Sequence, residues 1–134
     1  MLQYLAALVL LGHGLGHSIG PLASLGVKIK GMNERPSWLL PGQRGMSSTV
    51  GKAWSVLWIA TIVPFVISSM GAFMGEIWWR DWAIIGAVIS IAAILPWWNS
   101  VIAGVKGGLL LDVAILIVLL TSWGEDIIDF FELP

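Results

Sequence analysis

The chain has 134 residues, of which 57% are hydrophobic and 11% are charged, and its mean hydropathy is +0.89. An ordinary soluble domain has about 25% charged residues, so this composition excludes a soluble globular protein. The formal net charge of -1 provides no basic surface that would hold a nucleic acid. The absence of cysteine excludes thiolate metal sites, iron–sulfur clusters and cysteine nucleophiles. We therefore expect the surface of the protein to contact a lipid bilayer, which is its expected partner.

Four apolar stretches predict four membrane-spanning helices in a single all-α domain that covers residues 1–134. A span needs about 20 apolar residues, because a helix rises about 1.5 Å per residue and the hydrocarbon core is about 30 Å thick. We expect an integral membrane four-helix bundle in up-down-up-down order, with one long loop between the first and second helices. The predicted spans cover residues of about 2–25, 53–73, 82–98 and 107–123.

Two of these spans contain features that bear on their ends. The first should be a true span rather than a cleaved signal peptide, because its first residues, MLQY, carry no basic side chain. Pro21 should kink or end its helix. The third span is the shortest, and we expect it to extend past Pro96 to include Trp97 and Trp98.

Basic residues predict the orientation of the spans. The segment 26–52 is too polar to cross a bilayer and is interrupted by Pro36 and Pro41, so it should form a long loop. Only Arg80 lies on the opposite side from the other basic residues, and cytoplasmic loops carry an excess of Lys and Arg. The loop should therefore be cytoplasmic, with both termini extracytoplasmic at the plasma membrane. The residues on the loop side are Lys28, Lys30, Arg35, Arg44, Lys52 and Lys106.

Tryptophans fall near the predicted ends of the spans, as indole rings do where hydrocarbon meets the lipid headgroups. Trp38 in the loop and Trp58 inside the second span are the exceptions. The others form a predicted interface belt, with Trp54, Trp97 and Trp98 at the inner boundary and Trp78, Trp79, Trp82 and Trp123 at the outer one.

The last segment, residues 124–134, is predicted to be an amphipathic helix that lies on the outer surface. Ile127, Ile128 and Phe131 share one helical face. An interfacial anchor is favoured over a helix that docks a partner, because short amphipathic ends commonly rest on bilayers. The acidic residues, mostly on the opposite face, are Glu125, Asp126, Asp129 and Glu132.

The segment GHGLGHSIG in the first span carries two stripes of residues. Gly12, Gly16 and Gly20 share one helix face and predict a close helix contact, either within the bundle or between the two chains of a homodimer. His13 and His17 form the neighbouring stripe. Two imidazoles at this spacing reach one ion in zinc-binding helices, but a metal site needs a third ligand.

Asp112 is the only carboxylate inside a predicted span, and we expect it to share a site with the two histidines. It lies six residues beyond Lys106, about 9 Å inside the cytoplasmic boundary, while His17 lies about 5 to 15 Å inside the same boundary. The first and fourth helices of an up-down bundle are antiparallel neighbours. Because unpaired ionisable groups are costly inside a bilayer, the three residues should form one satisfied polar group, with His13 one turn deeper than His17.

Three interpretations of this group remain open. The residues His13, His17 and Asp112 would lock two helices by a hydrogen bond, hold Zn²⁺ or Fe²⁺ as a two-histidine, one-carboxylate set, or bind the head group of a quinone, lipid or other amphiphile. Haem is less favoured, because both histidines project from one helix. The sequence does not determine whether the chain is an enzyme. The alternatives are a quinone-linked oxidoreductase, a dimeric transporter and an accessory subunit of a larger membrane complex. No hydrolase motif is present.

Three segments of the chain resemble a group of small four-span membrane proteins of bacteria and archaea. The segments are GHGLGHSIG, GKAWSVLWIATIVPF and ILPWWNSVIAGVKGGLLLDVAILIVLL. They match an HGxxH-like element in the first span (His13 to His17), a G-x-x-W-x-x-L-W-like start of the second (Gly51 to Trp58) and a proline with tryptophans before the last (Pro96 to Trp98). The resemblance implies four spans and no particular activity. A fainter likeness to DoxX-type proteins, some of which are linked to quinone-dependent oxidation, rests on size and span number alone.

Overall fold

A computed structural model describes residues 2–42, 44–130 and 133–134, and the described chain contains helices and no strand. Four helical segments are long and apolar enough to cross a membrane, as the sequence predicts. They comprise α1 (Leu2–Gly16) with α2 (Ile19–Ser24), α3 (Thr49–Met74), α4 (Trp79–Ile94) with the short 3-10 helix η1 (Leu95–Trp97), and α5 (Ala103–Leu120). A shorter helix, α6 (Ser122–Phe130), follows.

The first span is interrupted where the sequence places a proline, as predicted. The ring of Pro21 occupies the space that the carbonyl of His17 would need in a continuous helix, and proline has no N–H to donate to that carbonyl. The chain therefore leaves the helix after Gly16 and resumes it at Ile19. Gly20 donates its N–H to the His17 carbonyl at 3.2 Å instead. The interruption sets the direction in which the His17 side chain leaves the backbone.

The second span has clear signals at both ends. Ser48 is the N-cap of α3, and its side chain accepts a hydrogen bond from the Gly51 N–H at 3.1 Å. Gly75 ends the helix with a φ of 75°, a left-handed conformation that glycine adopts without strain. The helix thus begins at Thr49 rather than at the predicted residue 53, and the cap explains the difference.

The third and fourth spans also begin earlier than predicted. The helix α4 starts at Trp79 rather than residue 82, and η1 continues it through Pro96 to Trp97. The helix α5 starts at Ala103 rather than residue 107, so Lys106 lies in its first turn and not in the connection before it. The Lys106 ammonium group is 5.2 Å from the centre of the Trp98 ring, a cation–π contact.

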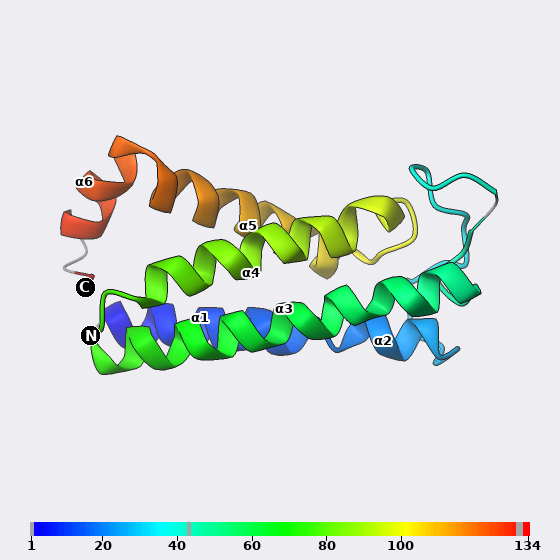
Figure 1. Cartoon of the computed structure of the whole chain (residues 1–134), viewed down its shortest axis with the longest axis horizontal. Coiled ribbons are helices and arrows are strands. Elements are labelled where there is room, and N and C mark those ends of the chain that lie inside the picture. Colours follow the sequence, from blue (N-terminus) through cyan, green and yellow to red (C-terminus); the bar gives the residue numbers. More distant parts are fainter. Residues whose placement is uncertain (1, 43, 131–132) are drawn as a thin grey trace.

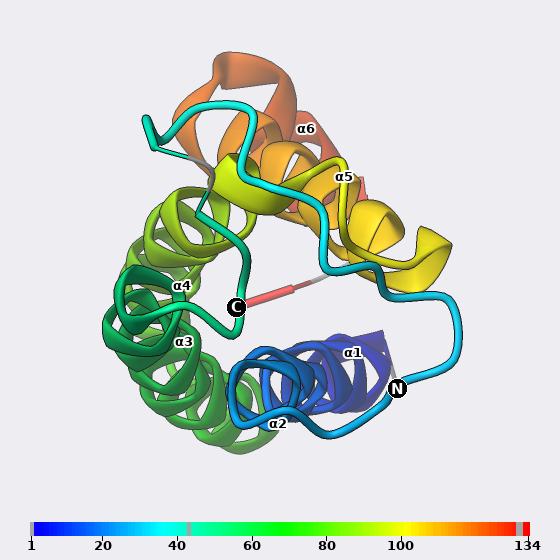
Figure 2. The ribbon, with the colours of Figure 1, turned by 90° about the vertical axis from the view of Figure 1, so that its right-hand side faces the viewer.

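The long helices lie side by side along the longest axis of the molecule (Figure 1). The helix α3 packs against α1 on one side and α4 on the other, and α4 packs against α5. Seen from the end, these four helices follow an arc, and α1 and α5 face each other across its open side (Figure 2). The connection between α2 and α3 runs across this end, and α6 lies at the other (Figures 1 and 2).

The long connection is anchored to the turn between α4 and α5 by side-chain hydrogen bonds. The hydroxyl of Ser37 donates to the Pro96 carbonyl at 2.5 Å, and the indole of Trp97 donates to the Arg44 carbonyl at 3.1 Å. The hydroxyl of Ser100 donates to another carbonyl of the connection at 3.0 Å. Buried polar groups of this irregular segment are thus satisfied by the turn that it covers.

Two tryptophans of the predicted interface belt are buried within the chain. Trp79 and Trp97 have 6% and 1% of their surface exposed, so their rings pack against protein. Trp123 is 74% exposed, as an interfacial ring would be. The location of a bilayer boundary at the seven predicted tryptophans stays a prediction.

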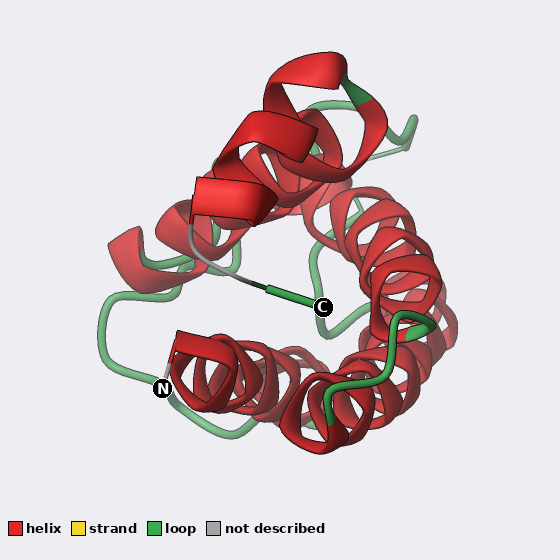
Figure 3. Cartoon of the chain, turned by 90° about the vertical axis from the view of Figure 1, so that its left-hand side faces the viewer, coloured by secondary structure: helices red, strands yellow, loops and turns green. Residues whose placement is uncertain are grey.

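The segment after the last span is helical, and α6 lies against the end of α5 (Figure 3). On the predicted apolar face Ile128 is buried and Ile127 is 40% exposed. Phe131 and Glu132, which the sequence analysis places on opposite faces, lie outside the described residues. The guanidinium group of Arg80 donates to the Pro134 carbonyl at 2.9 Å, so the end of the described chain returns to the start of α4.

Candidate functional site

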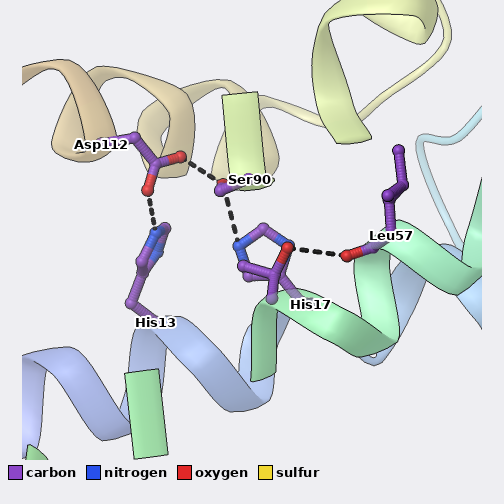
Figure 4. A network of polar contacts seen from close by, with 6 residues as sticks. His13, His17, Leu57, Ser90 and Asp112 are labelled. Carbon is purple, nitrogen blue, oxygen red and sulfur yellow. Dashed lines mark hydrogen bonds and ion pairs between the residues drawn. The ribbon is translucent and has the colours of Figure 1, made fainter. Parts of the chain in front are cut away.

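Side chains from three spans meet inside the bundle (Figure 4). His13 comes from α1, His17 from the interruption after α1, Ser90 from α4 and Asp112 from α5. Asp112 has no exposed surface, and His17 is 3% exposed. The structure therefore brings together the three residues that the sequence analysis places in one site, and it adds Ser90 between them.

Asp112 receives a hydrogen bond on each of its carboxylate oxygens. Nε2 of His13 donates to Oδ1 at 2.6 Å, the length of a charge-assisted bond. The hydroxyl of Ser90 donates to Oδ2. A carboxylate in an apolar interior is costly unless its oxygens are paired, and here both are.

The direction of these bonds also sets the proton on His17. Nε2 of His17 is 3.1 Å from Oγ of Ser90. Because Ser90 has a single hydroxyl proton and donates it to Asp112, its oxygen can only accept from His17. His17 therefore carries a proton on Nε2, and because a second proton on Nδ1 would be a buried charged N–H without an acceptor, Nδ1 has a free lone pair. That Nδ1 is buried and has no hydrogen-bond partner.

Aromatic rings surround the two imidazoles. The Phe65 ring lies edge-on to His13, with 4.6 Å between ring centres, and the Trp58 ring is 5.6 Å from that of His17. The two imidazoles are 5.1 Å apart in an edge-to-face arrangement. A Cβ added at Gly14 would lie 2.7 Å from Cβ of Phe65, so this glycine permits the close approach of α1 and α3.

A cavity of about 400 Å³ adjoins the histidines between α1 and α5. Its wall combines His13 and His17 with apolar side chains and with glycines from both helices. The glycines are Gly12, Gly16, Gly104, Gly107 and Gly108. The apolar residues are Leu8, Val9, Ile19, Trp58, Ile94, Ile102, Val105 and Leu111. The cavity lies between α1 and α5, the two helices that face each other across the open side of the arc (Figure 2).

The glycine stripe of the first span has two roles in the structure. A Cβ at Gly12 or Gly16 would meet no atom within 4 Å, and both residues line the cavity. A Cβ at Gly20 would collide with the Trp58 ring. Within the described chain, the close contact expected of the stripe is thus found at Gly20 and not at Gly12 or Gly16. A contact between two chains stays a prediction.

The structure also reverses the order of the two histidines about Asp112. The sequence analysis places His17 beside Asp112 and His13 one turn away, whereas His13 makes the direct bond and His17 is linked through Ser90. The signal for Ser90 was present in the sequence, since it is the only hydroxyl residue of the predicted span 82–98.

The three sequence-predicted residues also meet the distance requirement of a metal group. One ligand atom from each of His13, His17 and Asp112 lies within 4.8 Å of the other two. Two ligands of a tetrahedral Zn²⁺ lie about 3.3 Å apart when each metal–ligand bond is about 2.0 Å. The 2.6 Å between His13 and Asp112 is a hydrogen-bond distance, so a metal ion would have to separate this pair and displace a proton.

Comparisons with protein-family models, with characterised proteins and with solved structures found no match to this chain. The function of the chain is therefore inferred from the residues of the site and from the cavity beside them.

Proposed function

We propose that the chain is a multi-pass protein of the plasma membrane whose four helical segments cross the bilayer in up-down-up-down order. The excess of basic residues on the side of the connection between α2 and α3 supports a cytoplasmic location for that connection and extracytoplasmic termini. The likeness to small four-span prokaryotic membrane proteins is part of the same proposal.

We further propose that the protein binds the polar head group of a small amphiphile at His13 and His17. The observation that carries this proposal is the cavity of about 400 Å³ that reaches both imidazoles between α1 and α5. Binding sites for small molecules are typically concave, mostly apolar and equipped with a few polar groups that fix orientation. An amphiphile would keep its tail in the bilayer and place its head against the two imidazoles of the wall.

A divalent metal ion, Zn²⁺ or Fe²⁺, is the second candidate ligand. The grouping of His13, His17 and Asp112 within 4.8 Å supports it, because two imidazoles and one carboxylate leave an open coordination position. The short bond between His13 and Asp112 favours the amphiphile, since it is already satisfied without an ion. In the third interpretation, an accessory subunit, the same bonds only lock α1, α4 and α5 together.

Analysis of the purified protein separates these three interpretations. Solvent extraction followed by mass spectrometry measures bound amphiphiles, and elemental analysis of the same sample measures metal. We expect an amphiphile in wild-type protein that is lost in Gly16→Leu, since a leucine at this position would fill the cavity. Ala114→Leu, on an exposed face of α5 away from the cavity, is the matched control and should retain the amphiphile.

Each other outcome contradicts the proposal in a distinct way. Stoichiometric zinc or iron without an amphiphile would establish the metal site. Neither ligand, or an amphiphile retained equally by Gly16→Leu and Ala114→Leu, would leave the hydrogen-bonded lock as the role of the group.

A further inference from the structure

We infer that the amphiphile is a hydrogen-bond donor, a hydroxylated molecule such as a phenol or an alcohol, whose O–H is accepted by a free Nδ1 atom, that of His13 or that of His17. The inference deepens the proposed function and rests on it. It depends on the direction of the hydrogen bonds around Asp112, which determines whether the cavity offers donors or acceptors to a ligand.

The donors of the network are all committed to the carboxylate. His13 donates directly to Asp112, and His17 donates to Ser90, which donates to Asp112. A second proton on Nδ1 of either ring would be a charged N–H with no acceptor among the described residues, which is costly in an apolar interior, so we infer that both imidazoles are neutral with the proton on Nε2. A neutral imidazole with its proton on one nitrogen accepts a hydrogen bond at the other. Within this network, His13, His17 and Ser90 have no N–H or O–H left to give to a ligand, and the two imidazoles have two lone pairs to receive one.

Both lone pairs belong to residues of the cavity wall. Nδ1 of His17 is buried without a partner, although buried polar atoms are nearly always paired. Nδ1 of His13 makes no hydrogen bond within the described residues and would lie 3.5 Å from a Cβ placed on Gly108, another residue of the wall. A ligand hydroxyl at this wall would satisfy an atom that the chain leaves unsatisfied.

Asp112 and Ser90 act in this arrangement as positioning residues. A carboxylate that accepts from one nitrogen of an imidazole fixes the tautomer and raises the basicity of the other nitrogen. Asp112 does so for His13 directly and for His17 through the Ser90 hydroxyl. Neither residue lines the cavity, so neither contacts the ligand. Their effect on binding would pass through the two imidazoles.

The chain has only two histidines, so nitrogen NMR of ¹⁵N-histidine-labelled protein observes this site alone. In lipid nanodiscs we expect both rings as neutral Nε2–H tautomers. The probes are 4-nonylphenol and 4-nonylanisole, which share a ring and a tail and differ in the O–H. The phenol should shift an Nδ1 signal upfield and bind about tenfold more tightly than the anisole, the worth of one hydrogen bond to a buried group.

Two positions of α5 provide a test variant and its control. Gly108→Ala places a methyl group 3.2 to 3.5 Å from Cε1 and Nδ1 of His13 and should reduce affinity for the phenol about tenfold. Ala114→Leu enlarges a side chain on the exposed face of the same helix, away from the cavity, and should leave the affinity unchanged. Circular dichroism of both variants in the same nanodiscs checks that each is folded.

The possible outcomes test the donor inference separately from the proposed amphiphile site. Equal, saturable binding of the phenol and the anisole without an Nδ1 shift would overturn the donor inference and leave an amphiphile site. A resting spectrum with either histidine protonated on Nδ1 would overturn it as well. Saturable binding of neither probe would count against the amphiphile site itself.

Discussion

Replacing Ser90 with alanine should destabilise the protein more than the loss of any comparable hydroxyl. Ser90 has no exposed surface, and its hydroxyl is bonded to both Asp112 and His17. The variant leaves one carboxylate oxygen without a donor and one imidazole N–H without an acceptor. No wider change is expected, because alanine favours a helix at least as well as serine does.

The free-energy cost of Ser90→Ala can be estimated from the number of polar groups that lose their hydrogen-bond partner. Leaving one buried polar group unsatisfied costs about 1 to 3 kcal/mol in a water-soluble protein. Inside a bilayer a helix–helix hydrogen bond is worth less, about 0.6 kcal/mol on average, because the unfolded state in the membrane also finds partners. Two abandoned groups, one of them a carboxylate, place the cost for Ser90→Ala at about 2 kcal/mol.

Ser68→Ala is the control for this measurement. Ser68 is equally buried and lies in a span, but its hydroxyl makes one bond, to the Trp79 carbonyl at 2.7 Å. It should cost about 1 kcal/mol less than Ser90→Ala, a difference of about fivefold in the unfolding equilibrium. Unfolding by sodium dodecyl sulfate in mixed micelles, followed by circular dichroism, measures both. Equal destabilisation by the two variants would refute the bridging role of Ser90.

Three further predictions follow from the structure. Gly16→Leu should change the free energy of unfolding by less than about 0.5 kcal/mol, because the new side chain fills open space. Gly14→Leu should cost about 1 to 3 kcal/mol, because the new side chain overpacks against α3, and thermal unfolding of the two variants checks this contrast. Asp112→Asn keeps one acceptor oxygen, which can accept from His13 or from Ser90 while the amide N–H₂ donates to the other residue, so the fold should retain much of its stability; a larger loss than that of Ser90→Ala would contradict this. A cysteine introduced as Arg35→Cys should react with an impermeant thiol reagent only after the cells are opened, and labelling of intact cells would mean that the orientation is reversed.

The positions of the spans could be predicted from the sequence because each depends on local composition. Apolar stretches and Pro21 predicted four crossing segments and the interruption of the first. Their exact ends could not be predicted, because they depend on contacts with other segments. Ser48 caps α3, and the connection between α2 and α3 is anchored to the turn at Pro96 by bonds that join residues far apart in the sequence.

The site could be predicted only as far as depth and charge allow. Asp112 inside a bilayer required partners, and the two histidines were the only ionisable groups at a similar depth, which was sufficient to place the three together. The sequence alone does not determine how each helix is rotated about its axis. It therefore could not show whether His13 or His17 bonds directly to Asp112. As the only hydroxyl residue of the predicted span 82–98, Ser90 was a candidate bridge, but composition alone does not show that this span lies beside both histidines and Asp112.

The open side of the bundle explains why polar residues and glycines occur together in α1 and α5. If these helices packed closely, the imidazoles of His13 and His17 would be covered by neighbouring side chains and the glycines would contact the opposite backbone. Instead Gly12 and Gly16 face open space, while Gly14 and Gly20 fit α1 and α2 against α3. One set of glycines thus fixes the first span to the rest of the chain, and the other maintains the cavity. The histidines lie between the two sets, where a rigid wall and an accessible space meet, and this is the arrangement that a binding site for a membrane-dissolved molecule requires.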